Sequence, residues 1–399
     1  MNQKNKHSTS DPHISPKTNS PREIDRSIAK LALPSLGTLL VEPLLVAVDS
    51  TMVGHLGTKE LAGLALASTL LNTLIGLCIF LTYATTASTA HFVGKGNPAK
   101  AARLGIDGIW LALGLGSALS LFLFFAAAPL LSLFKPNPEV LPQAVAYLQA
   151  SAFGFPAMLL VLASTGALRG FSDTKSPLIA STAGALINIP LNAVFIYAAG
   201  LGVAGAGYGS ALAQAGIGIF LTWRFAQIAR KQNISLFPSG DGVLKSLHDS
   251  APLIIRTLSL RTALLLQIAA AAALGTAALA ANQIVMSMWN FAAYGLDSLA
   301  IAAQILIGQG LGSSDAQKVR MILSRCLRWS VRAGIILGCI FIAISFFVPH
   351  LMSIDASVQK LSMHTMRLTS LALPIGAVTY MLDGILIGAG DTKNLRNTC

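Results

Sequence analysis

Long apolar segments separated by short polar ones dominate the pattern of this chain. The apolar segments are continuous rather than alternating, and most have at least the roughly 20-residue length of a helix that crosses a bilayer. Barrel strands would be shorter, with every second side chain polar, so the pattern predicts helices. We expect an all-α polytopic membrane protein with ten transmembrane helices. The segments cover residues 33–54, 61–91, 105–128, 143–168, 178–200, 205–226, 252–274, 278–307, 331–349 and 365–387.

Two acidic residues interrupt the first apolar segment. Glu42 and Asp49 stand seven residues apart, about two helical turns, so a helix would place both on one side. A carboxylate at the bilayer centre costs at least about 2.5–3.5 kcal/mol on insertion scales, and one that is retained usually has a function or a partner. We expect both to couple transport to a cation. The alternatives are a structural acid at Asp49 and a mouth-facing residue without a role at Glu42.

Prolines lie inside several of the predicted helices, and those of the first and fifth bear on the candidate site. Pro34 and Pro43 fall in the first, and each removes a backbone donor and predicts a kink. Pro190 lies in the fifth, between Asn188 and Asn192, which share a helix face at i, i+4 spacing. The carbonyl freed by Pro190 and the two amides could bind a cation or an ammonium group. The alternative is that the amides form ordinary hydrogen bonds between membrane helices.

The eighth apolar segment carries a row of polar residues. Gln283, Asn290, Asp297 and Gln304 recur at intervals of seven, and Tyr294 lies beside them. A heptad drifts only about 20° around a helix, so the row forms one polar face. Such a face would be costly against lipid, and we expect it to line a substrate cavity. A seam packed against another helix is the alternative.

The chain matches itself when it is shifted by 218 residues. Pro34 then falls on Pro252, and "GFSDTK" (170–175) falls on "GAGDTK" (388–393), while "VGKG" (93–96) matches "IGQG" at a shift of 214. The pattern predicts two pseudo-symmetric helical bundles that are parallel repeats, related by an axis along the membrane normal.

The two repeats are unequal in length. The first holds six predicted helices and the second four, so we interpret the chain as shortened by two helices relative to its ancestor. The expected divisions are a disordered cytoplasmic arm (1–25), an N-terminal six-helix lobe (26–228), a cytoplasmic linker (229–250) and a C-terminal four-helix lobe (251–399).

Composition and charge fit this picture. Hydrophobic residues make up 54% of the chain and charged residues 11%, well under the roughly 25% of soluble domains. The net charge of +12 gathers on one set of loops when the helices alternate across a bilayer, which places the N-terminus in the cytoplasm and excludes nucleic acid as the reason for the charge. The four cysteines and seven histidines show neither disulfide nor metal-ligand spacing, so we expect no metal and no cofactor.

Several motifs together resemble one transporter family. "DSTMVGHLG", "VGKGNPAKAARLG" and "ALRGFSDTKSP" are similar to the multidrug and toxic compound extrusion (MATE) family, and "AAYGLDSLAIAAQILIGQGLG" and "LDGILIGAGDTK" resemble its DinF-like branch. The resemblance implies two six-helix lobes in a V and export of organic cations or amphiphiles against protons or sodium ions. It also implies that Asp49 is the coupling aspartate, that Asn188 matches a family asparagine, and that Asp383 belongs to the substrate cavity. Asn192 stands where some relatives carry an acid.

These observations favour a monomeric antiporter in the plasma membrane, most simply the bacterial cytoplasmic membrane. Its substrate would be a small cationic or amphiphilic compound. One alternative is a flippase for a lipid-linked precursor, which the cations Arg256 and Arg261 in the seventh segment would suit. Another is an inactive remnant of a transporter. A membrane enzyme is disfavoured because no histidine or cysteine joins Glu42 and Asp49.

Overall fold

The computed structural model describes residues 20–390, except for the side chains of residues 240–252. Every regular element in this part of the chain is a helix, which confirms the predicted all-α class. The helices are α1 (Pro21–Gly54), α2 (Thr58–Cys78), α3 (Phe80–Gly94), α4 (Pro98–Ser132), α5 (Leu141–Ala152), α6 (Phe155–Gly170), α7 (Lys175–Ala193), the π-helical turn η1 (Val194–Ala198), α8 (Gly202–Lys231), α9 (Gly240–Ala273), α10 (Thr276–Gly312), α11 (Ala316–Ile344), α12 (Val348–Met352) and α13 (Ala356–Ala389).

The helices follow the predicted apolar segments with two breaks. Segment 61–91 is divided at Ile79 into α2 and α3, and segment 143–168 becomes α5 and α6, bent by 50°. Among the described residues, eight helices are long and apolar enough to cross a membrane, or nine if the bent pair is one span. Helix α8 covers segment 205–226 but is not among them, so the count of ten spans stays a prediction.

The first helix begins earlier than the predicted arm allows. Residues 1–19 lie outside the described part, but Pro21 to Asp25, which were assigned to the arm, form the first turn of α1. Ser20 accepts a hydrogen bond from the Glu23 amide, and Glu23 accepts one from the Ser20 amide, so a capping box starts the helix. The cap is a local signal that outweighs the polar composition of this stretch.

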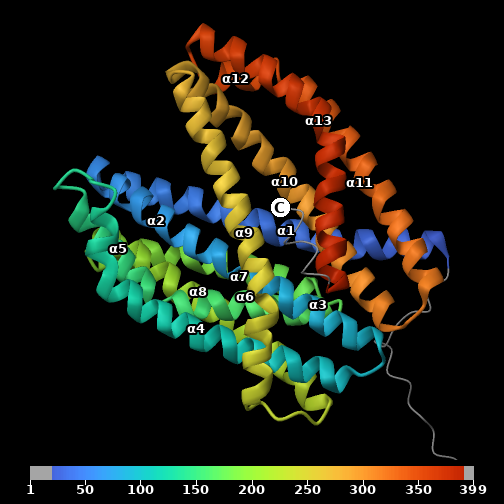
Figure 1. Cartoon of the computed structure of the whole chain (residues 1–399). Helices are drawn as coiled ribbons and strands as arrows, with labels where there is room; N and C mark the ends of the chain where they lie inside the picture. Colours follow the sequence, from blue (N-terminus) through green and yellow to red (C-terminus); the bar gives the residue numbers. More distant parts are fainter. Residues whose placement is uncertain (1–19, 391–399) are drawn as a thin grey trace, which may run out of the picture.

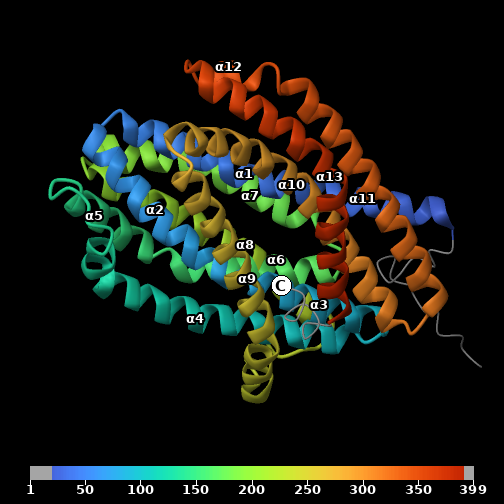
Figure 2. The same cartoon turned by 45° about the horizontal axis from the view of Figure 1, so that its top comes forward.

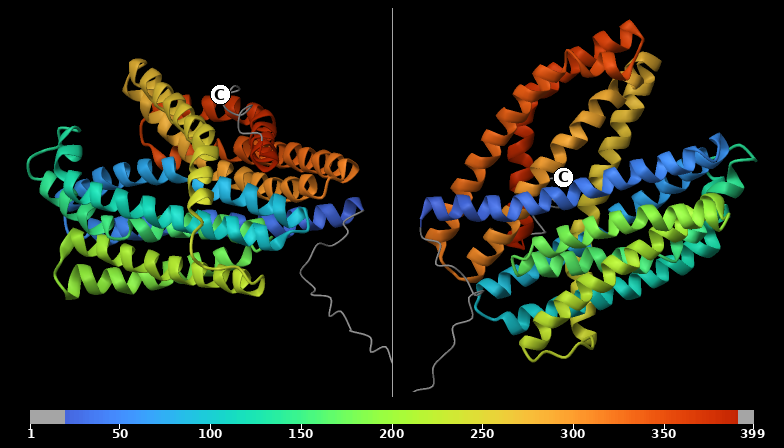
Figure 3. Two further views of the ribbon diagram at one scale, coloured as in Figure 1. Left: turned by 60° about the horizontal axis from the view of Figure 1, so that its bottom comes forward. Right: turned by 180° about the vertical axis from the view of Figure 1, so that it is seen from behind.

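The helices gather into two groups that diverge as a V, which the right-hand view of Figure 3 shows from behind. We call α1–α8 the N-lobe and α9–α13 the C-lobe. Helix α9 crosses over the N-lobe and then continues into the C-lobe arm, where it joins α10 (Figures 1 and 2). It contacts α2, α3 and α4 as well as α10, so it ties the two lobes together.

Segments that the sequence repeat aligns have similar local structure in the two lobes. Gly57 and Gly275, which the shift of 218 aligns, each precede a helix with a positive φ, of 155° and 106°. The "VGKG" and "IGQG" segments pack against each other where the V closes (Figure 3). A Cβ on Gly94 would overlap the Gln309 carbonyl oxygen, and one on Gly312 would overlap the His91 carbonyl oxygen. We call this contact, formed by Gly94, Gln309 and Gly312 with His91, the α3–α10 seam.

Candidate ion-coupling and substrate site

Asp49 lies at the centre of a buried ring of hydrogen bonds within the N-lobe. Its Oδ1 accepts from the Asn192 amide at 2.7 Å, and its Oδ2 accepts from the Ser210 hydroxyl at 3.2 Å. Asn192 also donates to Asn188 Oδ1 at 3.0 Å, and Asn188 donates to Ser210 Oγ at 3.1 Å. These four residues, the Asp49 cluster, are all at least nine-tenths buried. Two donors to the carboxylate offset part of the cost of burying it.

The sequence of α7 and α8 makes this ring possible. Asn188 and Asn192 share one face of α7, as their spacing predicts, and both are fully buried. Gly209 of α8 faces them, and a Cβ there would overlap Asn192 Oδ1. This oxygen has no hydrogen-bond partner in the described residues. The cluster therefore presents an unpaired acceptor beside a carboxylate.

Contacts outside the Asp49 cluster also fix the position of α1, the helix that carries Asp49. Pro190 lies inside α7, and the next turn, η1, has π-helical geometry. Tyr197 of η1 donates to the Met52 carbonyl of α1 at 2.7 Å. The Tyr147 ring on α5, which is buried, lies within electrostatic range of Asp49. The sequence alone does not single out Tyr147, Tyr197 and Ser210, because their partners on α1 are far away in the chain.

Glu42 lies outside the Asp49 cluster, although both residues are on α1. Asp49 is 7% exposed and faces α7 and α8, whereas the Glu42 side chain is exposed and lies within electrostatic range of Tyr294 on α10. Helix α1 runs between the lobes, contacting both α7 and α10. The two acids lie about 10 Å apart along the axis of α1, so each meets a different lobe although the seven-residue spacing keeps them near one helix face.

The polar row of α10 changes surroundings along the helix. Gln283 and Asn290 are exposed, and Tyr294 and Asp297 are half-buried. Gln304 is buried and donates to the Tyr83 carbonyl of α3 at 3.0 Å. The end of the row near Gln304 is therefore an interhelical contact, while the end near Gln283 is open.

Charged residues from both lobes meet beside this row. Arg256 of α9 holds Asp383 of α13 through two hydrogen bonds, from Nε to Oδ1 at 2.6 Å and from Nη2 to Oδ2, and lies 5.9 Å from the Tyr83 ring centroid. Asp297 is within electrostatic range of Asp383, Arg256 and Arg169. We call Tyr83, Arg169, Arg256, Asp297 and Asp383 the interlobe charge cluster. It supplies Asp383 with a partner on α9.

Arg169, like Tyr83, is a member of this cluster that the sequence did not reveal. It ends α6 in the motif "ALRGFSDTK", where its position suggested a loop charge. Instead it is 6% exposed, and its Nε has no hydrogen-bond partner among the described residues. A cation buried at the junction of two lobes marks the junction as polar.

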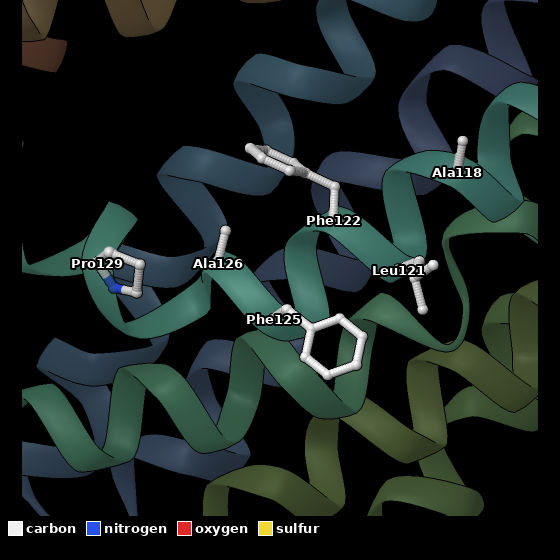
Figure 4. Close-up of a pocket in the computed structure, with 6 residues that line it drawn as sticks. All are labelled: Ala118, Leu121, Phe122, Phe125, Ala126 and Pro129. Carbon is white, nitrogen blue, oxygen red and sulfur yellow. The ribbon is translucent and has the colours of Figure 1, made fainter.

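Two further features of the described residues bear on the kind of site. These residues contain no group of three histidine, cysteine or acidic side chains that could hold a metal ion. A hollow on α4 (Figure 4) is lined by side chains that are all apolar: Ala118, Leu121, Phe122, Phe125, Ala126 and Pro129. Such a surface suits lipid chains rather than an ion.

Membrane-length helices in two lobes, with carboxylates buried inside one lobe and between both, define a polytopic membrane transporter. The family model described as MatE matches residues 34–194 and 252–395, so the chain belongs to the MatE family. Members of this family are transporters and not enzymes.

Curated relatives support this assignment. The chain is 33% identical over 286 residues to Protein DETOXIFICATION 43 of Arabidopsis thaliana, a match that covers 70% of this chain and 53% of that protein. The chain therefore spans about half the length of that relative. It is 26% identical to DNA damage-inducible protein F of Escherichia coli, over 94% of this chain and 83% of that protein. Multidrug resistance protein MdtK of Yersinia pseudotuberculosis is 25% identical over 93% of this chain and 83% of its own length.

Solved structures share the fold. The bent form of the Vibrio cholerae MATE transporter VcmN superposes with a TM-score of 0.87 at 19% identity, over 94% of this chain and 86% of that one. A MOP superfamily transporter from Pyrococcus furiosus gives a TM-score of 0.84 at 20% identity, over 96% and 87%. At these identities the likeness concerns the fold alone.

Proposed function

We propose that this chain is a secondary antiporter that exports organic cations or amphiphilic compounds in exchange for protons or sodium ions. The observation that carries the proposal is the Asp49 cluster, a buried carboxylate beside an unpaired amide oxygen. Carboxylate, amide and hydroxyl oxygens are ligands that hard cations prefer, and a carboxylate also takes a proton. No resident metal or cofactor is part of the proposal.

The coupling ion acts through the hydrogen bonds of Asp49. A proton or sodium ion on the carboxylate competes with the donors Asn192 and Ser210, so the ring on α7 and α8 rearranges when the ion arrives. An ion changes the balance between two states only if it binds them with different affinity. The geometry of the ring depends on how tightly α1 packs against α7 and α8. The affinity of Asp49 for the ion therefore differs between states that pack these helices differently.

The substrate occupies the space between the lobes. Glu42 and Asp297 bring negative charge to this space, and the half-buried Tyr294 between them adds an aromatic surface. An organic cation with a flat apolar body matches both features. We place the open residues Gln283 and Asn290 along the same path.

The proposal includes the orientation and setting of the chain, of which the charge pattern supports the orientation. The N-terminus lies in the cytoplasm of the cell, because the loops on that side carry most of the lysine and arginine residues. The membrane is the plasma membrane, most simply a bacterial cytoplasmic membrane, and the transporter works as a monomer.

The test is ion-driven efflux of a cationic dye from proteoliposomes that contain the full chain. Asp49→Asn is expected to lower gradient-driven efflux at least about a hundredfold, since it removes the only charge in the cluster that can exchange a cation. Glu139→Gln is the control, because Glu139 is exposed and pairs only with Lys59 on the surface. Efflux by Asp49→Asn at the unmodified rate, with equal protein inserted, would overturn the proposal.

A flippase for a lipid-linked precursor is the second candidate. Arg169 and Arg256 at the lobe junction favour it, because an anionic head group needs cations along its route. Asp297 and Asp383 beside them reduce this positive charge, so the cation antiporter ranks first. Stimulation of binding by anionic lipid-linked sugars, with no competition by cationic dyes, would favour the flippase.

A further inference from the structure

Helix α1 belongs to both lobes at once. Near its start, Ile24, Ile28 and Leu31 are buried in an apolar cluster with α10, α11 and α13 of the C-lobe. Near its end, Asp49 enters the ring on α7 and α8, and Val53 joins the apolar core of the N-lobe. The two ends are on the order of 35 Å apart along the helix axis. A single element therefore connects the Asp49 cluster with the opposite lobe.

The start of α1 is fixed to the C-lobe by polar contacts as well. Asp25 accepts from Arg325 of α11 twice, from Nε to Oδ1 at 3.0 Å and from Nη2 to Oδ2. The indole nitrogen of Trp329, one turn further along α11, donates to the same Oδ1 at 3.0 Å. The side chains of Arg325 and Asp25 are only 18% and 28% exposed. The Asp25 carboxylate accepts from three donors, two of them in one guanidinium group. These bonds fix the orientation of the start of α1 relative to α11 as well as the distance between them.

The middle of α1 is its most deformable part. Pro34 and Pro43 lie inside the helix and remove two backbone hydrogen bonds, so this stretch bends at lower cost than the ends. Leu33 and Leu44 are 67% and 66% exposed, which leaves little packing to resist a bend. A displacement of α1 at Asp49 therefore either bends the helix between the two prolines or moves its first turns.

We propose that Asp25, Arg325 and Trp329 are positioning residues for transport, an anchor through which α1 couples the Asp49 cluster to movement of the C-lobe. This inference rests on the proposed function. With the anchor intact, rearrangement around Asp49 changes the pull of α1 on α11 and shifts the balance between lobe positions. Without it, the start of α1 adjusts locally, and the ion site and the lobes move independently.

The experiment compares dye binding with gradient-driven efflux in the full-length chain. Asp25→Asn and Arg325→Gln are expected to leave the dye Kd within about twofold while efflux falls about fivefold or more, the range of typical coupling factors. The double variant should lose no more than the worse single variant, because both remove one interaction. Arg328→Gln is the matched control, since within the described part of the chain the Arg328 side chain, on the same helix, donates hydrogen bonds only to Ser324, one turn earlier.

Two further variants keep the test decisive. Trp329→Phe removes one donor to Asp25 and keeps an aromatic ring, so it should lower efflux by less than Arg325→Gln without loss of folded protein. Wild-type efflux in Asp25→Asn and Arg325→Gln, or losses that multiply in the double variant, would overturn the anchor. If Asp49→Asn abolishes efflux while the anchor variants do not, only the anchor fails. If Asp49→Asn also transports normally, the proposed function fails.

Discussion

The Asn192 amide nitrogen lies 2.7 Å from Asp49 Oδ1, although the two residues are 143 positions apart in the chain. This contact connects α1 to α7 in the interior of the N-lobe. It gives the carboxylate a fixed orientation and holds it beside the unpaired Oδ1 of Asn192.

Asn192→Ala removes one of the two donors to Asp49. A hydrogen bond to a charged group is worth about 1.5–3 kcal/mol, so we expect ion-driven efflux to fall on the order of tenfold or more. Tm in detergent should also fall, because alanine leaves the buried Asp49 Oδ1 and Asn188 Oδ1 without this donor, so efflux is compared at equal amounts of folded protein. Efflux assays over a range of proton and sodium gradients measure the effect. An unchanged ion dependence would show that Asn192 does not act on the coupling ion.

Gly209→Ala tests the same ring from the opposite helix without altering any polar group. The added Cβ would overlap Asn192 Oδ1, so the amide must turn or α8 must shift away. We expect efflux to fall about as much as in Asn192→Ala, because the same hydrogen bond to Asp49 is broken.

The control for this substitution lies on the same helix. A Cβ at Gly216 of α8 meets nothing within 4 Å, so Gly216→Ala should transport normally and gain up to about 1 kcal/mol of helix stability. Equal efflux in the two alanine variants would contradict the role of the tight contact.

The sequence predicts the helices of this protein better than their contacts. Continuous apolar segments locate the membrane helices, because length and hydrophobicity are local properties, although the polar first turns of α1, α9 and α11 begin 12, 12 and 15 residues before the predicted segments. The i, i+4 spacing of Asn188 and Asn192 likewise predicts their shared face, and the structure puts both against Asp49.

Contacts between distant helices could not be read in the same way. Ser210 is one hydroxyl in a glycine-rich helix, and its bond to Asp49 spans 161 positions. Arg256 and Asp383 are 127 positions apart, and each alone resembles an isolated charge in an apolar segment. The separation of Glu42 from the Asp49 cluster has a related reason, since helical periodicity gives the direction of a side chain but not which lobe it meets.

Asp383→Asn removes a partner that holds Arg256 between the lobes. The two side chains are 12% and 25% exposed, so the pair is partly shielded from water. Removing one member of a buried pair costs about 3 kcal/mol or more, whereas replacing both members with apolar residues is often neutral. We therefore expect a lower Tm for Asp383→Asn in detergent and recovery in the double variant Arg256→Met with Asp383→Leu. A double variant less stable than the single one would contradict this account.

Gly94→Ala should open the V at the end where it is closed. The added Cβ would overlap the Gln309 carbonyl oxygen, a backbone atom that cannot rotate away, so α3 and α10 must separate along the seam. Packed interfaces respond to such an insertion by switching or shifting rather than by compressing.

Spin labels at the exposed residues Lys100 and Ser314, in a cysteine-free background, should report longer distances than in the parent, together with reduced ion-driven efflux. Gly114→Ala on α4 is the control, because its Cβ meets nothing within 4 Å, and its distance distribution should match the parent. A Gly94→Ala protein with the parental distances and efflux would show that the α3–α10 seam does not hold the lobes together.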